Sequence, residues 1–159
     1  MKKSQNLLGF TLIELLVVIS IIGILAALGT ARYAMIEKST RDAQRKSDLN
    51  QYRAALETYA SLNGSNYPIV SNNTNGGNTN GGLCDTGSPA FKTQYLSGAC
   101  LLDPFNNATY YYRYYSDGIN YVLVAYMEVS QAGKQYYEIC SNGRSGYVTL
   151  APTNSVCNL

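Results

Sequence analysis

The chain has 159 residues, enough for one compact domain of ordinary size plus an additional segment. Twelve basic and ten acidic side chains leave a formal charge of +2, so the composition gives no electrostatic basis for binding nucleic acid. There is no histidine, which excludes Ser/His and Cys/His catalysis and removes the commonest zinc ligand, and we therefore expect no enzymatic activity.

The first thirty residues predict an export signal that continues into a helix. Lys2 and Lys3 precede an apolar run at residues 10–31. The polar exceptions in this run are Thr11, Glu14, Ser20 and Thr30. As a helix the run would be about 33 Å long, enough to cross a bilayer, and the lysines before it predict a cytoplasmic start. An ordinary signal peptide is disfavoured because no small-residue cleavage site follows a short apolar region.

Glu14 distinguishes this run from a plain membrane anchor. It places a carboxylate about one turn inside an apolar segment, where an ionised group costs several kcal/mol unless it is paired. A simple anchor has no use for such a group. Glu14 is therefore a candidate functional residue.

The sequence GFTLIELL at residues 9–16, followed by VVISIIGILAA at 17–27, resembles the class III signal of type IV prepilins and type II secretion pseudopilins. The resemblance implies cleavage by a prepilin peptidase between Gly9 and Phe10, followed by N-methylation of Phe10. Glu14 would then be the fifth residue of the mature chain, which this family uses to meet the N-terminal amine of a neighbouring subunit. A carboxylate and an ammonium stabilise each other strongly in low dielectric, so this pair would set the axial register of a filament.

The resemblance further implies a structural subunit of a type IV pilus-like filament. It would be a single-pass precursor in the inner membrane, and then part of an extracellular pilus or a periplasmic pseudopilus. Its partners would be copies of itself, the prepilin peptidase, and an assembly platform with its ATPase. Two alternatives stay open: a type II secretion pseudopilin, and a minor tip subunit that contacts DNA or a surface through residues 72–82 or tyrosine-rich strands.

Residues 32–62 predict the second half of one long helix. Leu49, Tyr52, Leu56 and Tyr59 recur at three- and four-residue spacing, which is typical of an amphipathic helix that packs on a sheet. Upstream, charges of both signs alternate at Glu37, Lys38, Arg41, Asp42, Arg45, Lys46 and Asp48. These charges predict either a solvated helix face with i, i+4 pairs or complementary contacts between neighbouring subunits.

Residues after 62 predict a β-rich head. Residues 72–82 contain Asn, Thr and Gly alone and predict a flexible loop. We expect strands at residues 110–115, 121–127, 136–140 and 147–150, joined by turns. The 15 tyrosines suit buried strands better than a nucleic-acid platform, since no basic groove accompanies them.

The predicted fold class is therefore α+β, with a long N-terminal helix, apolar in its first half and amphipathic in its second, packed on a four-stranded antiparallel sheet as in type IV pilins. We divide the chain into a leader peptide at residues 1–9, a transmembrane and filament-core half-helix at 10–31, an amphipathic half-helix at 32–62 and a disulfide-closed head at 63–159.

The four cysteines contain no CxxC pair, which disfavours a zinc ribbon or a thioredoxin-like site. Two disulfides, each closing a loop of about 17 residues, fit better and require export to an oxidising compartment. A disulfide around the last loop resembles the arrangement in type IV pilins. We accordingly expect the pairs Cys84–Cys100 and Cys140–Cys157, one of three connectivities.

Two segments resemble type II secretion major pseudopilins, which stabilise their heads with calcium. One is Asp103, Pro104 and Phe105, and the other is Tyr67 with Pro68. The late loop that would hold calcium corresponds to residues 141–146, which contain no acid and one cation, Arg144. Because calcium usually takes at least one carboxylate, a calcium site is disfavoured and no cofactor is expected.

Overall fold

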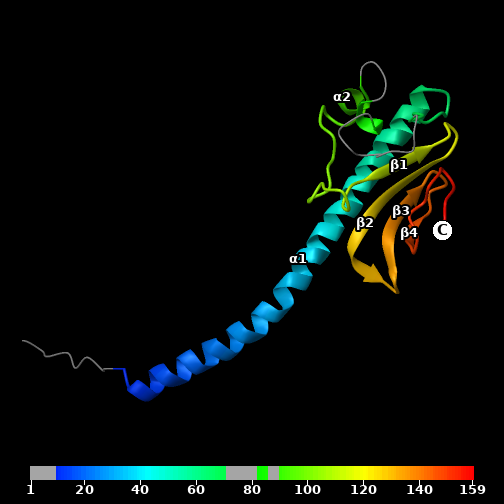
Figure 1. Ribbon diagram of the computed structural model, residues 1–159. Helices are drawn as coiled ribbons and strands as arrows, with labels where there is room; N and C mark the ends of the chain where they lie inside the picture. Colours follow the sequence, from blue (N-terminus) through cyan, green and yellow to red (C-terminus); the bar gives the residue numbers. More distant parts are fainter. Residues whose placement is uncertain (1–9, 71–81, 86–89) are drawn as a thin grey trace, which may run out of the picture. The chain divides into compact units, whose positions relative to one another are not determined.

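The computed structural model describes residues 10–70, 82–85 and 90–159, and of residues 28–32 and 85 it describes the backbone alone (Figure 1). The chain divides into two compact units, Met1–Glu37 and Lys38–Leu159. The long helix α1, Leu12–Leu62, contributes to both units.

The ends of α1 follow from local sequence. No proline occurs between residues 12 and 62, so no residue lacks the backbone N–H that the helix needs. At the C-terminal end the chain reaches Gly64, whose φ of +64° is a left-handed conformation that glycine adopts without strain. The Ser65 N–H then donates to the Ala60 carbonyl at 2.8 Å, which is the reversal typical of a Schellman motif.

The second unit contains an antiparallel sheet in the order β1-β2-β3-β4. The strands are β1 Arg113–Ser116, β2 Tyr121–Gln131, β3 Lys134–Cys140 and β4 Ser145–Val148. The first turn is held by Asp117, whose Oδ1 accepts hydrogen bonds from the N–H groups of Ile119 and Asn120 at 2.9 and 2.6 Å. The sheet lies along the second half of α1, which confirms the predicted α+β class (Figure 1).

The core lies between α1 and one face of the sheet. Leu49, Tyr52 and Leu56 are fully buried and Tyr59 packs beside them, as the helical spacing predicts. The same cluster contains Tyr112, which directly precedes β1, and the strand residues Tyr114, Tyr121, Leu123, Ala125, Met127 and Ile139. A second, smaller cluster covers the opposite face of the sheet. Its members are Tyr115, Val122, Val124, Cys140, Tyr136, Cys157 and Leu159.

Some strand limits and two short helices differ from the sequence-based expectation. β1 begins at Arg113 rather than residue 110, because Asn107 forms a local turn whose N–H donates to the Tyr110 carbonyl at 3.0 Å. β4 ends at Val148 rather than residue 150. The 3-10 helix η1, Leu83–Asp85, and the helix α2, Phe91–Tyr95, were not predicted. Neither has a long apolar repeat, which is why the sequence gives no signal for them.

Buried charges join α1 to the sheet. Arg45 is fully buried, and its guanidinium binds Asp103 at 2.6 and 3.1 Å, Asp42 at 2.7 Å and Glu128 at 2.8 Å. Arg41 binds both Glu128 oxygens at 2.7 and 2.6 Å. Neither interpretation of the alternating charges accounts for these residues, because Asp42 and Arg45 are interior groups that hold the helix on β2.

We predict that Arg45→Gln lowers the free energy of unfolding of the head by about 3–5 kcal/mol, because it leaves buried carboxylates without their cation. The matched variant is Arg41→Gln, since the Arg41 side chain binds the same Glu128 but is 19% exposed. We expect it to lower stability by only about 1 kcal/mol. Urea denaturation followed by the near-ultraviolet signal of the tyrosines measures both. Equal losses would show that burial of Arg45 has no special weight.

Glu128 should also make stability depend on pH. Its hydrogen bonds to Arg41, and then to Arg45, outweigh burial and lower its pKa from 4.5 to about 2. A carboxyl whose pKa is lower in the folded state adds stability in full above its unfolded pKa and loses it on acidification. Stability should therefore fall as the pH drops from about 4.5 through about 2, and the fall should be smaller in Glu128→Gln. Identical acid titrations of the two proteins would contradict this.

Candidate functional site

Thr11 and Glu14 form a reciprocal hydrogen-bonded cap at the start of α1. The Glu14 Oε2 atom accepts hydrogen bonds from the Thr11 N–H at 2.9 Å and the Thr11 hydroxyl at 2.7 Å. In return, the Glu14 N–H donates to Thr11 Oγ1 at 3.3 Å. This is a capping box, which satisfies backbone donors that the first helical turn leaves without partners.

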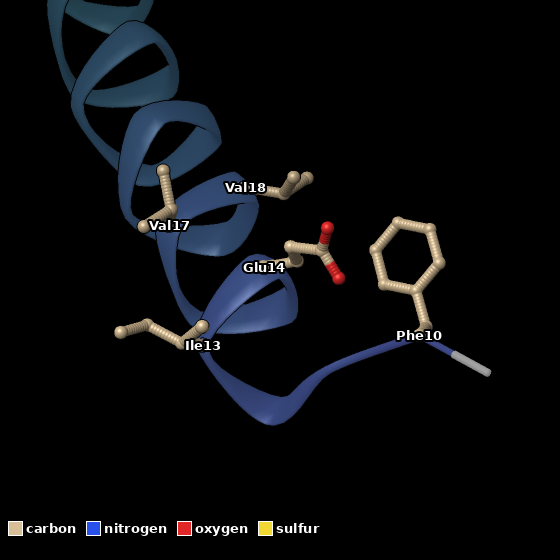
Figure 2. Close-up of a pocket in the computed structure, with 5 residues that line it drawn as sticks. All are labelled: Phe10, Ile13, Glu14, Val17 and Val18. Atoms are coloured by element: carbon tan, nitrogen blue, oxygen red, sulfur yellow. The ribbon is translucent and has the colours of Figure 1, made fainter. Parts of the chain in front are cut away.

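The Glu14 carboxylate borders a shallow hollow of about 320 Å³. The hollow is lined by Phe10, Ile13, Glu14, Val17 and Val18. Figure 2 shows the carboxylate pointing away from the helix, toward the side on which the Phe10 ring lies. Because the other four side chains are apolar, a cationic group entering here would find Glu14 as its charged partner in weakly polar surroundings.

The helix surface that follows is exposed and apolar. Every large apolar side chain from Leu12 to Leu25 is between 46% and 88% exposed. A continuous apolar surface of this kind marks a site of interaction with protein or lipid. The sequence predicts a membrane-spanning segment at residues 10–31. In the residues that the structure describes, no helix combines the length and the apolar character that crossing a membrane requires.

Other predicted site residues are placed as follows. Gly9 lies outside the described residues, as does the loop at 72–82 apart from Gly82. Phe10 lies directly before the capping box and is 78% exposed. The structure joins Cys84 to Cys100 and Cys140 to Cys157. These are the pairs that the sequence analysis anticipated.

The loop at residues 141–146 is closed by its own polar groups. The Asn142 side-chain oxygen accepts a hydrogen bond from the Arg144 N–H at 3.0 Å, and the Arg144 carbonyl accepts one from the Cys140 N–H at 2.9 Å. Within the described residues, the cluster of metal-ligand types is Glu138, Cys140 and Cys157, whose sulfurs are bonded to each other. The expectation that no calcium binds stays a prediction.

The Asp103 motif has a role in the head itself. Asp103 is buried and binds Arg45, and its Oδ1 also accepts a hydrogen bond from the Phe105 N–H at 2.9 Å. The Phe105 ring receives the guanidinium of Arg41 at 4.7 Å from its centroid. This segment therefore anchors the sheet-side loop to α1.

Sequence reasoning missed two sets of residues. Thr11 could have been found, because Thr at one position and Glu three residues later, before an apolar run, is the capping-box signature. The interior position of Arg45, Asp42 and Asp48 carries no such signal. Their partners Asp103, Tyr112 and Glu128 lie more than fifty residues away in the chain.

Comparison with known proteins gives a match in the N-terminal part of the chain. Residues 8–30 match the family model of the prokaryotic N-terminal methylation motif. Two curated proteins, both called type IV major fimbrial protein FimA, from Dichelobacter nodosus, are each 44% identical to this chain over 58 residues. That match covers 36% of this chain and 36% of each relative, so the chain spans about a third of the length of the relatives that it matches. No solved structure matches the chain significantly.

The family model and the capping box place the same residues together. Phe10, Thr11 and Glu14 lie inside the matched segment, at the beginning of α1. The resemblance drawn from the sequence is thereby confirmed: residues 8–30 of this chain are a prokaryotic N-terminal methylation motif.

Proposed function

We propose that the chain is a structural subunit of a type IV pilus-like filament, cut after Gly9 and polymerised through the first half of α1. The observation that carries the proposal is the Glu14 carboxylate beside Phe10, at the start of an exposed apolar helix and inside a methylation motif. The similarity of 58 residues to proteins named type IV major fimbrial protein supports a filament rather than an isolated membrane protein.

Cleavage would change the chemistry of this site. In the precursor the Phe10 nitrogen is a neutral amide, whereas in the mature chain it is an amine with a positive charge. An amine from a neighbouring subunit could then approach Glu14 across the apolar hollow. The amine–carboxylate pair would be strongly favoured there, and either charge left without its partner would cost free energy. Only one axial position of the neighbouring subunit would therefore pair both charges.

The precursor's location and partners follow from the motif rather than from the hydropathy of the helix. We infer attachment to the inner membrane with residues 1–9 on the cytoplasmic side, where a prepilin peptidase acts. An assembly platform with its ATPase would then extract the mature subunit. Loss of Lys2 and Lys3 leaves ten basic and ten acidic side chains, so a neutral subunit would enter the filament.

The pseudopilin alternative rests on the Asp103 motif. Since Asp103 binds the buried Arg45, its presence is explained by the packing of the head. Purified surface filaments distinguish these ideas. A major pilus subunit would make up nearly all of their mass, a tip subunit a trace at one end, and a pseudopilin would be absent from them.

The cleavage assignment predicts that Gly9→Val stays as an uncut, membrane-attached precursor. The side chain at this position would obstruct the peptidase, while the helix that follows is unchanged. Intact-mass spectrometry of the membrane fraction should show the full-length chain, and the wild type should show a methylated Phe10 terminus. A mature Phe10 terminus in the variant would refute the assignment.

The pairing role of Glu14 can be separated from its capping role. Glu14→Gln keeps the size and the hydrogen-bond acceptor of the cap but removes the charge, and we expect filament yield to fall by about tenfold or more. Thr11→Val removes the hydroxyl that binds Glu14 while keeping the carboxylate, and we expect yield within about twofold of wild type.

Both variants should be cleaved and methylated normally, which mass spectrometry of the N-terminus checks. Filament yield is measured by shearing and quantitative immunoblotting. Normal filaments from Glu14→Gln would eliminate the charge pair. Loss of filaments in Thr11→Val as severe as in Glu14→Gln would show that helix capping is what assembly requires.

A further inference from the structure

Glu138 is a fully buried carboxylate on the face of the sheet that does not pack against α1. It lies in the middle of β3, between Val124 of β2 and Gly146 of β4. The segment after β4 covers it, and a Cβ atom on Gly146 would lie only 2.9 Å from Leu159 Cδ2. A glycine at this position therefore lets the covering segment lie flat on the sheet above Glu138.

The two carboxylate oxygens of Glu138 have different surroundings. Oε1 accepts a hydrogen bond from the Asn158 N–H at 2.7 Å, whereas Oε2 is buried and has no hydrogen-bond partner among the described residues. The amide oxygen of a neutral glutamine could accept the same hydrogen bond from the Asn158 N–H. Leaving an ionisable group with an unsatisfied oxygen in the interior is expensive, so anchoring the segment does not by itself explain a glutamate here.

Glu138 lies beside both sulfurs of a disulfide. Its Oε1 is 3.8 Å from Cys140 Sγ and 3.8 Å from Cys157 Sγ. Cys140 is 1% exposed and Cys157 is partly exposed. A thiol buried in apolar surroundings loses its proton less readily, so Cys140 in the reduced protein needs a nearby base to become a nucleophile.

We propose that Glu138 is the proton acceptor for closure of the Cys140–Cys157 disulfide by exchange with an external disulfide. The proposal does not depend on filament assembly. It concerns how the head becomes covalently closed after export.

The reaction has two steps. First, the thiolate of Cys157, the more accessible sulfur, attacks the donor disulfide RSSR, forming a mixed disulfide and releasing RS⁻. Second, the Cys140 thiol gives its proton to Glu138, its sulfur attacks Cys157 Sγ, and a second RS⁻ leaves. Two protein thiols are oxidised to one disulfide, and the donor is reduced to two thiols once protons from Glu138 and solvent are taken up.

The charges around Glu138 are compatible with this role. Burial raises the pKa of Glu138 above 4.5, and this is opposed by hydrogen bonds from Asn158, by the positive charge of Arg144 and by the backbone of Leu159. The neighbouring strand β2 presents Val124, which has no charge, and the covering segment contributes Cys157 as its titratable group nearby. A carboxyl with a raised pKa is a stronger base than an ordinary one and is better matched to a thiol.

The other disulfide supplies an internal control. The group close to Cys84 Sγ is the Tyr52 hydroxyl, at 3.3 Å. Burial raises the pKa of Tyr52 above its usual value, so this hydroxyl stays protonated and cannot accept a proton. Closure of Cys84–Cys100 should therefore be independent of Glu138.

The test uses the full-length chain in detergent, reduced with dithiothreitol, freed of the reductant and mixed with oxidised glutathione. Acid quenching, alkylation and peptide mass spectrometry follow each cysteine pair at a series of pH values. In Glu138→Gln we expect closure of Cys140–Cys157 to slow about tenfold, with glutathione accumulating on Cys157. In the wild type, the rate of Cys140–Cys157 closure plotted against pH should show an inflection where Glu138 titrates, and Glu138→Gln should lack it. Cys84–Cys100 should close at the same rate in both proteins.

Glu138→Asp, which keeps the acid but shortens it by one methylene, should retain the inflection and part of the rate. An unchanged rate of Cys140–Cys157 closure in Glu138→Gln would overturn the proposal, because Glu138 would then play no part in it. Faster closure would overturn it too, because the glutamate charge would then be hindering the thiolate. Equal slowing of both disulfides would overturn it as well, because the glutamate would then act through folding of the head.

Discussion

The head of this protein depends on one buried guanidinium. Arg45 projects from α1 and binds a carboxylate on its own helix, one on β2 and one in the loop before β1. Buried ion pairs often add little net stability, because desolvation offsets attraction, but the loss of one partner is severe. The network also ties the second half of α1 to the sheet side at one point, because a single guanidinium binds Asp42, Asp103 and Glu128 together.

The tyrosines extend the same arrangement. Tyr112 donates to Asp48 at 2.6 Å, and Tyr121 donates to Glu57 at 3.0 Å, so tyrosines in or next to the sheet bury their rings and direct their hydroxyls to acids on α1. Burial raises the pKa of Asp48, and the hydrogen bond from Tyr112 opposes this rise. The helix–sheet interface thus has an apolar centre with a polar border. This accounts for several of the 15 tyrosines without any role in stacking against a nucleic acid.

Sequence patterns predicted the parts of the structure that depend on local periodicity. The helical spacing of Leu49, Tyr52 and Leu56 predicted the buried face, and β-prone runs separated by turn residues predicted four strands. Local patterns failed where distant residues decide the outcome. Asp42 and Arg45 have the spacing of a solvated helix face, and only the presence of Asp103 and Glu128, far along the chain, makes them interior groups. At the candidate site the sequence identified Phe10 and Glu14 but not the threonine that holds the carboxylate.

That threonine changes the energetic argument for Glu14. By itself, a carboxylate in an apolar helix would be a charged group that needs a partner such as an amine. The capping box gives the Glu14 carboxylate two hydrogen bonds within its own chain, so its charge already has hydrogen-bond donors. Pairing with a neighbour would therefore be an exchange of partners, in which the gain is the difference between an ammonium and the N–H and hydroxyl of Thr11. Because Glu14 would exchange one set of partners for another, the free-energy gain on pairing would be smaller than for a carboxylate with no partner. A gain of that size would suit a subunit that stays in the membrane before it assembles into a filament.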